Sequence, residues 1–464
     1  MVPFTRSTMT SFVLAVVFCL SAVTGSSADA QAVRNRILMR VFWQDRETAQ
    51  LSWADITSGD KWGIKRAWIH GFPMVDAENQ ELAPMKHHNG VLVTGVRDHQ
   101  DGTLQSGWIS VDTGVFEEPH GNHTHWKYTG LPKVTGMNLD AHQGNPGQLS
   151  VSENIFYLAH DQKNGFSQLQ PSLLKQASSA SESAKFFSGG GSHIALAAVN
   201  DAVAYSSWDD ESGPNGGRVD VVPLRQAGKP KIAYSFQLPS AAIHGITHNS
   251  GKVFLAPADG ICWVKVDLSL KETAESVQVN YLSLGQDELS DRPVRTGTFS
   301  NARNWVLCTT GEGDQSKLCL INAESADPSV VKVNVPAADG LRLTAPETVL
   351  SLGNRYAFLF QERTDAVNGV QEQLTVVELD PDRNRDFSDA RIRTTIPVGA
   401  SRTEGHHGHH AIAFDAYGRY AAFTEPGEGI LNLFSLQDMQ VVARFKVGGS
   451  PDRIVAVGAP EHFH

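Results

Sequence analysis

Histidine is frequent in this sequence and occurs in clusters. There are 18 histidines among 464 residues, and most of them stand in clusters. The run HGNHTH places His120, His123 and His125 close together in a segment rich in turn-forming residues. Neutral imidazole nitrogens bind Zn²⁺ in tetrahedral geometry at about 2.0 to 2.1 Å. We therefore expect a loop that aims three imidazoles at one ion, with one further ligand to complete the set; the alternative is a polar loop without a metal.

A second run, EGHHGHHAIAF, contains four histidines directly before a predicted strand. They are His406, His407, His409 and His410. So many imidazoles have little use in an apolar core, so this run also predicts metal binding. A solvated loop that binds metal only adventitiously is the alternative.

The elements that must position these residues form an internal repeat. A unit of two apolar strands joined by a polar or glycine turn recurs roughly every 50 residues. Short strands separated by Gly, Asp and Asn turns are typical of β-propeller blades, each a four-stranded sheet. The sequence predicts an all-β chain with a single β-propeller. Eight blades are favoured and seven remain possible, because the Glu153 copy is irregular and the first copy could be an extension. The copies begin near Arg36, Asn89, Glu153, Asn200, Ser250, Arg303, Asn354 and Gly418.

Two segments stand apart from the repeat. Residues 448–458 (GGSPDRIVAVG) are predicted to form the inner strand of a blade whose other strands come from the Arg36 copy, which would pair the two ends of the chain. Such closure removes exposed sheet edges. Residues 171–187 are rich in Ser and Ala and predict a surface excursion or a short helix.

Three histidines occupy similar places in the repeat. His193, His244 and His410 each stand seven or eight residues before the turn that opens the next strand, at the start of a blade's innermost strand. Inner strands line the central channel of a propeller, so equivalent positions converge on its mouth. We expect a shared metal site there, to which His142 could also belong, and the HGNHTH loop is expected to fold over the same face. Separate structural histidines are the alternative.

The first thirty residues predict a cleaved secretory signal. Arg6 precedes an apolar run at residues 11–23, and Ala28-Asp29-Ala30 has the small-x-small form that signal peptidase cuts. The propeller domain is then 31–464. No later stretch has the roughly 18 to 20 apolar residues that span a membrane. We therefore expect an exported, periplasmic protein without membrane insertion.

Composition excludes one class of partner. The formal net charge is -11, and no run of five Lys or Arg residues occurs. Phosphate binding needs a basic face, so a nucleic-acid partner is excluded. We expect a monomer.

Cys308 and Cys319 flank a glycine-rich loop between two apolar segments, which predicts that they face each other on a hairpin. In an oxidising compartment they could form a disulfide. Two reduced core cysteines are the alternative.

The chain resembles the AztD-type periplasmic zinc metallochaperones. DTGVFEEPHGNHTHWKY is similar to a valine-rich strand end followed by a His-Gly-x-His loop in that family, and AAIHGITHNSGKVFLAPADGICWVKVD is similar to its His-Gly strand and Asp-Gly hairpin. The resemblance implies a β-propeller that binds zinc and hands it to the solute-binding protein of a zinc ABC importer.

Three functions are compatible with this sequence. The favoured one is a non-catalytic zinc carrier or buffer. A metal-dependent propeller enzyme, such as a hydrolase with an ion at the channel mouth, would need an open coordination position and a nearby carboxylate base. Next to the histidines in sequence stand only Asp140, Glu117, Glu118 and Glu404. This scarcity favours the carrier; a propeller that serves only protein interactions is the third possibility.

Overall fold

The structure is a computed structural model that describes most of the chain after residue 35. The described ranges are 36–100, 104–121, 123–176, 183–209, 213–225, 231–287, 290–363, 369–405 and 407–460, without the side chain of His123. The predicted signal at residues 1–30 and His406 lie outside these ranges.

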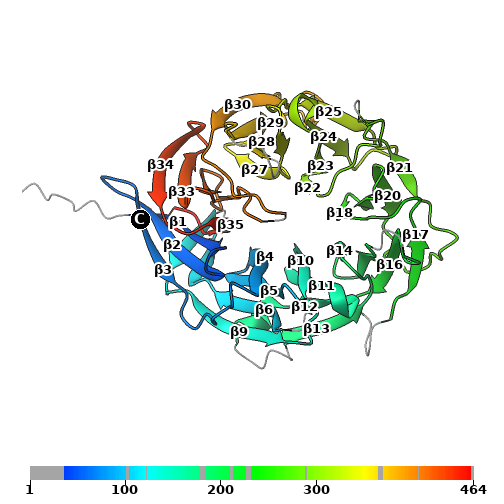
Figure 1. Cartoon of the computed structure of the whole chain (residues 1–464), viewed down its shortest axis with the longest axis horizontal. Helices are drawn as coiled ribbons and strands as arrows, with labels where there is room; N and C mark the ends of the chain where they lie inside the picture. Colours follow the sequence, from blue (N-terminus) through cyan, green and yellow to red (C-terminus); the bar gives the residue numbers. More distant parts are fainter. Residues whose placement is uncertain are drawn as a thin grey trace, which may run out of the picture.

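Eight β-sheets surround a central channel, which confirms the eight-bladed propeller (Figure 1). We number the blades 1 to 8 in chain order and give each from its inner strand outwards. Blade 1 contains β35 (Pro451–Val457), β1 (Arg36–Asp45), β2 (Gln50–Ser58) and β3 (Gly63–Trp68). Blade 2 contains β4 (Gln80–His88), β5 (Val91–Asp98), β6 (Ser106–Asp112) and β9 (Lys133–Asp140). Blade 3 contains β10 (Pro146–Ser152), β11 (Ile155–His160), β12 (Gly165–Leu169) and β13 (Ala184–Ser188). Blade 4 contains β14 (Leu196–Val199), β15 (Val203–Ser207), β16 (Arg218–Pro223) and β17 (Tyr234–Gln237).

The other half of the ring repeats this arrangement. Blade 5 contains β18 (Gly245–Asn249), β19 (Lys252–Ala256), β20 (Ile261–Lys265) and β21 (Asn280–Leu282). Blade 6 contains β22 (Ser300–Ala302), β23 (Trp305–Thr310), β24 (Lys317–Asn322) and β25 (Val330–Asn334). Blade 7 has an inner strand in two parts, β26 (Leu341–Leu343) and β27 (Glu347–Ser351), followed by β28 (Asn354–Arg363), β29 (Gln373–Glu378) and β30 (Arg391–Pro397). Blade 8 contains β31 (Ile412–Phe414), β32 (Tyr420–Glu425), β33 (Ile430–Ser435) and β34 (Gln440–Lys446).

The core lies between neighbouring blades. The second strands are buried almost throughout, as in β5, whereas outer strands such as β30 are largely exposed. Each blade packs face to face against the next, so both faces of a second strand need apolar residues. One cluster joins blades 4 and 5 through residues that include Val221 and Leu255, and another joins blades 7 and 8 through Phe358 and Phe423.

The two ends of the described chain meet in blade 1, as the sequence predicts. β35 pairs antiparallel with β1, with Phe42 opposite Val455. The C-terminal strand thus supplies the inner strand of a blade that otherwise comes from the N-terminal copy, and β1 is paired on both sides.

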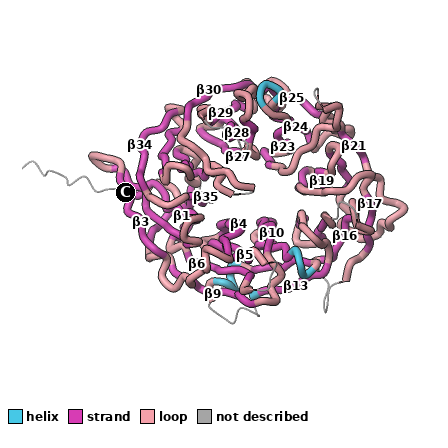
Figure 2. The backbone as a smooth tube through the Cα atoms, in the orientation of Figure 1, coloured by secondary structure: helices cyan, strands magenta, loops and turns pink. Residues whose placement is uncertain are grey.

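Several local expectations are refined by the structure. The Glu153 copy is a regular blade. Within residues 171–187, a short helix α2 (Pro171–Leu174) is present, but Ala184–Ser188 is the outer strand of blade 3. Two 3₁₀ turns, η1 (Asp161–Lys163) and η2 (Gly313–Gln315), account for other short helical segments in Figure 2.

No helix in the described ranges is both long and apolar enough to cross a bilayer.

Cys308 and Cys319 stand directly opposite each other on β23 and β24, which confirms the predicted hairpin. Both are fully buried, and neither is bridged in this structure.

Arg40 on β1 links blade 1 to blade 2. Its Nε donates to Asp55 at 2.7 Å, and its Nη1 donates to the carbonyl oxygens of Thr113 and Gly130, both at 2.7 Å. The guanidinium carbon also lies 4.5 Å from the centroid of the Trp53 ring. One nearly buried side chain therefore satisfies acceptors on two blades.

We predict that Arg40→Met lowers the free energy of unfolding by about 3 kcal/mol, because buried acceptors lose their donor. Chemical denaturation followed by tryptophan fluorescence measures this loss. Arg46→Met is the control, since it removes an ion pair with the exposed Glu404; about 1 kcal/mol or less is expected from it. Equal losses in the two variants would contradict the role assigned to Arg40.

Candidate metal site at the entry mouth of the channel

The predicted metal ligands lie at two ends of the propeller. We call the end where the inner strands begin the entry mouth and the opposite end the exit mouth. His193 and His244 lie within three residues of the start of β14 and β18. His407, His409 and His410 precede β31, so all five are at the entry mouth. His142 is exposed in the turn between β9 and β10.

The HGNHTH segment lies at the exit mouth. It is a β-hairpin rather than a loop, formed by β7 (Val115–His120) and β8 (His123–Tyr128) between β6 and β9. Tyr417, in the turn that follows inner strand β31, donates from its hydroxyl to the carbonyl of Thr124. The expectation that His120, His123 and His125 share a face with His193, His244 and His410 is therefore wrong. The chain leaves β6 at the end where the inner strands finish, and the hairpin stays there.

Within the hairpin, two of the predicted ligands are neighbours. The ring centroids of His120 and His125 are 5.2 Å apart in an edge-to-face arrangement. Glu118 pairs with Lys127 at 2.6 Å, and this hydrogen bond is the main cause of its lowered pKa.

At the entry mouth, His193 and His244 come together from adjacent blades. Their ring centroids lie 5.4 Å apart. The Nδ1 atom of His193 is 3.3 Å from Asp161 Oδ2, and the Nδ1 atom of His244 is 3.2 Å from the carbonyl oxygen of Gly297. The sequence prediction that these two histidines converge agrees with this geometry.

The hydrogen bonds of this pair fix the tautomer of each ring. A carbonyl oxygen and an ionised carboxylate only accept hydrogen bonds, so each Nδ1 must carry the proton. The lone pair of each neutral ring is then on Nε2. Histidines that bind metals usually have this arrangement, in which an acceptor holds the second ring nitrogen.

Asp161 is the residue that orients His193. Arg97 donates to Asp161 Oδ2 at 2.9 Å, and the backbone N–H of Ile194 donates to Oδ1 at 3.1 Å. Burial alone would raise the pKa of Asp161, but the bonds from His193 and Arg97 lower it. The same bond raises the pKa of His193 above its usual value, with a smaller contribution from the charge of Asp209.

Arg97 extends this contact network toward blade 8. Its Nε lies 3.9 Å from Glu81 Oε1, and Glu81 Oε2 lies 2.9 Å from His407 Nε2 and 3.7 Å from His99 Nε2. Alternating acidic and basic side chains thus follow the entry mouth from blade 8 through blades 2 and 3 to blade 4.

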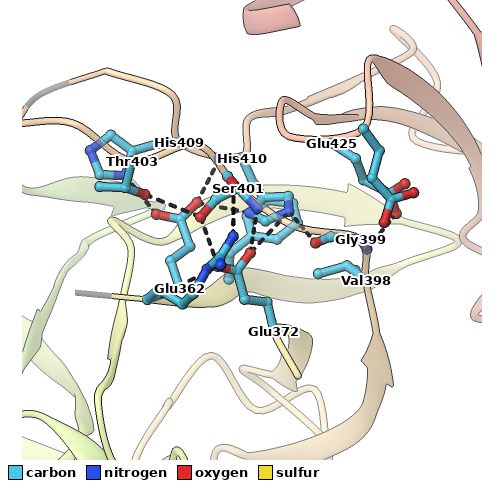
Figure 3. A network of polar contacts seen from close by, with 12 residues as sticks. Glu362, Glu372, Val398, Gly399, Ser401, Thr403, His409, His410 and Glu425 are labelled. Atoms are coloured by element: carbon cyan, nitrogen blue, oxygen red, sulfur yellow. Dashed lines mark hydrogen bonds and ion pairs between the residues drawn. The ribbon is translucent and has the colours of Figure 1, made fainter. Parts of the chain in front are cut away.

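His409 and His410 both contact Glu362, at the end of β28 (Figure 3). Their Nδ1 atoms are 2.6 Å and 3.0 Å from its two carboxylate oxygens, and the N–H of His410 also donates to it at 2.5 Å. The Nε2 atoms are near the carbonyl oxygens of Gly405 and Gly399. Since all four ring nitrogens meet acceptors, both rings act as imidazolium donors.

The charges of this cluster support that assignment. Burial would lower the pKa of His409 and of His410, but Glu362 raises both above the usual value. Burial would likewise raise the pKa of Glu362, yet the two histidines hold it at about 2. Glu372 lies 3.7 Å from His410 Nε2 and accepts hydrogen bonds from Ser401 and Arg363.

The three described histidines of the EGHHGHH run therefore do not converge on one ion. His407 turns to Glu81, whereas His409 and His410 turn to Glu362. Across the described residues, no group of three or more His, Cys, Asp or Glu side chains is arranged to hold a metal. Two pairs of imidazoles lie close together, His193 with His244 at the entry mouth and His120 with His125 at the exit mouth.

The expected equivalence of His193, His244 and His410 in the repeat also needs a correction. Asp161 accepts from the side chain of His193 and from the next backbone N–H; Glu362 does the same for His409 and the N–H of His410. The equivalent of His193 is therefore His409 rather than His410.

Sequence reasoning missed the carboxylates that hold these histidines, because they come from other blades. A signal for them is nevertheless present: in several copies of the repeat, the buried second strand ends on or next to an acidic residue. All are nearly inaccessible to solvent: Asp45, Asp98, Asp161, Glu362 and Glu425.

We predict that Glu362→Gln removes a pH dependence of stability. The raised pKa values of His409 and His410 mean that the native state binds their protons more tightly than the unfolded state. Their contribution is therefore complete below about pH 6.5 and is lost as the pH rises through the native pKa values. Denaturation at pH 6 and pH 9 should show a smaller difference for the variant than for wild type. An unchanged difference would mean that the two histidines are not charged at pH 6.

Comparison with solved structures identifies proteins of the same fold. A structure of apo AztD from Citrobacter koseri is 14% identical with a TM-score of 0.57, and the match covers 92% of this chain and 100% of that one. A second Citrobacter koseri AztD structure is 14% identical with a TM-score of 0.59, covering 93% and 100%. No family model and no curated protein matches the sequence. Over nearly its whole length, the chain is similar in fold to AztD.

Proposed function

We propose that this protein is a zinc carrier of the periplasm that buffers zinc or delivers it to the solute-binding protein of a zinc ABC importer. The observation that carries the proposal is the pair of His193 and His244, whose rings meet at the entry mouth with both Nδ1 atoms held by acceptors. The fold that the chain shares with AztD supports the same assignment, as does the predicted secretory signal at residues 1–30.

The chemistry of this pair suits a cargo ion. Zinc takes neutral imidazole nitrogens, and ligands beyond the two histidines would come from Asp209, from water or from the receiving protein. The side chain of His193 is 43% exposed, so a partner can reach it. Two imidazoles at an open position bind less tightly than a closed set of four ligands, which favours release to a partner.

The surroundings of the pair favour a carrier over a hydrolase. A metal-dependent hydrolase needs a carboxylate that is free to take a proton from the bound water. Asp161 is the carboxylate in contact with His193, and it is already engaged by Arg97 and by the N–H of Ile194. Its lowered pKa further weakens it as a base.

We predict that His193→Ala and His244→Ala each weaken zinc binding at least tenfold. Calorimetric titration of metal-free protein measures the affinity, and melting curves measure the stabilisation, which is about 2.7 kcal/mol when zinc is at 100 times its Kd. Because protons compete for His193, the affinity should also fall as the pH is lowered through its raised pKa. His142→Ala is the control, since His142 is exposed outside the pair. Unchanged affinity in both pair variants would exclude this site.

The proposed delivery of zinc to a partner leads to a separate prediction. If zinc passes directly to a periplasmic solute-binding protein, the transfer rate should exceed the rate at which zinc dissociates into a competing chelator. The reason is that an exposed histidine can share the ion with an incoming ligand before release. Stopped-flow fluorescence measures both rates. Equal rates would refute direct delivery and leave a zinc buffer.

A further inference from the structure

The β7–β8 hairpin is an addition to the four-stranded plan of its blade. Among the described residues it forms a two-stranded sheet of its own, whereas the other strands belong to the eight blades. It is inserted between β6 and β9, the two outer strands of blade 2, which pair directly with each other. Blade 2 is therefore complete without the hairpin, and the hairpin instead contacts the neighbouring blades.

The base of the hairpin is held by blade 1. Arg40 on β1 donates from Nη1 to the carbonyl oxygens of Thr113 and Gly130, which flank the two hairpin strands, both at 2.7 Å. The guanidinium carbon of Arg40 also lies 5.7 Å from the centroid of the Tyr128 ring at the end of β8. The hairpin is thus attached to the strand that pairs with the closing strand β35.

The body of the hairpin lies against the chain that follows β35. The hydroxyl of Tyr128 donates to the carbonyl oxygen of Ala459 at 3.0 Å. Gly458 has a φ of +85°, and a Cβ at this position would lie 2.5 Å from the Tyr128 hydroxyl oxygen and 3.2 Å from Val115 Cγ1. Val115 and Tyr128 also pack in the apolar cluster that contains Val457 of β35. The hairpin therefore contacts the end of the closing strand both by hydrogen bonding and by close packing.

The hairpin also reaches blade 8, on the other side of β35. The Tyr417 hydroxyl donates to the carbonyl oxygen of Thr124 on β8. Tyr417 lies in the turn between β31 and β32, and the N–H of Ala416 in the same turn donates to the carbonyl oxygen of Gly458 at 2.8 Å. Residues 458–459 are thus held between a turn of blade 8 and a hairpin that comes from blade 2.

We infer that the β7–β8 hairpin is a clasp that holds the ring closed by fastening β35 to blades 1, 2 and 8. Because β35 is separated from β1 by nearly the whole sequence, no short connection keeps the two strands together. Local opening can therefore release β35 without unfolding the other strands of blade 1. The clasp adds contacts that must break before β35 detaches. This role goes beyond the proposed zinc function and requires no metal.

The test is native-state hydrogen exchange, followed by mass spectrometry on metal-free full-length protein. In a variant with both Tyr128→Phe and Tyr417→Phe, the amides of β35 should exchange about tenfold faster than in wild type, because two hydrogen bonds of the clasp are lost. The amides of β14 and β18, in blades 4 and 5, should exchange as in wild type. Tyr281→Phe is the matched control, since it removes a hydrogen bond from a tyrosine hydroxyl to the carbonyl oxygen of Asp259 in blade 5. It should leave the exchange of β35 unchanged.

Gly458→Ala tests the close approach separately, because an added Cβ would press on Tyr128 while both tyrosine hydroxyls are kept. It should also accelerate the exchange of β35 more than that of β14. Exchange of β35 at the wild-type rate in the double tyrosine variant would overturn the inference. An equal acceleration in all blades would overturn it as well, since the two tyrosines would then contribute only to overall stability.

Discussion

The entry mouth depends on a buried carboxylate that reaches from the second strand of one blade to the backbone entering the next. Asp161 binds the N–H of Ile194 ahead of β14, and Glu362 binds the N–H of His410 ahead of β31. Each carboxylate also accepts from an imidazole that immediately precedes that N–H. A single acid thus sets the spacing of two blades and the orientation of a histidine. The histidines of the mouth are therefore oriented by interactions that also hold the ring together.

These contacts between carboxylate and imidazole give the histidines different protonation behaviour. His409 and His410 have acceptors at both ring nitrogens and share one buried carboxylate, so both rings are protonated in the folded protein. The Nδ1 of His193 meets one carboxylate, and much of its side chain is open to solvent. Burial strengthens each charge interaction and also makes an unpaired charge expensive. The imidazole of His193 is consequently more open to solvent than those of His409 and His410.

Local sequence pattern was enough to predict the propeller, its eight repeats and the pairing of its ends. Alternating apolar residues and turn glycines are properties of each blade alone, and the position of His244 ahead of an inner strand follows from them. The partners of the histidines could not be found this way, since Glu362 and His409 are far apart in sequence and meet only after two blades pack. The HGNHTH segment was misplaced for a related reason: its turn-forming residues indicate a reversal of the chain, but do not say at which end of the blade the reversal lies.

The pairing of β35 with β1 means that the ring is completed by the last of the described strands. Ser450 donates its N–H to Asp45 across 405 residues of sequence. Until Pro451–Val457 arrives, β1 presents an unpaired edge, and the core between blades 8 and 1 stays open. Contacts of such long range form slowly, and exposed strand edges invite association with other chains. A chain that is still folding therefore keeps an exposed strand edge until β35 has paired with β1, and cleavage before Pro451 would reopen the ring between blades 8 and 1.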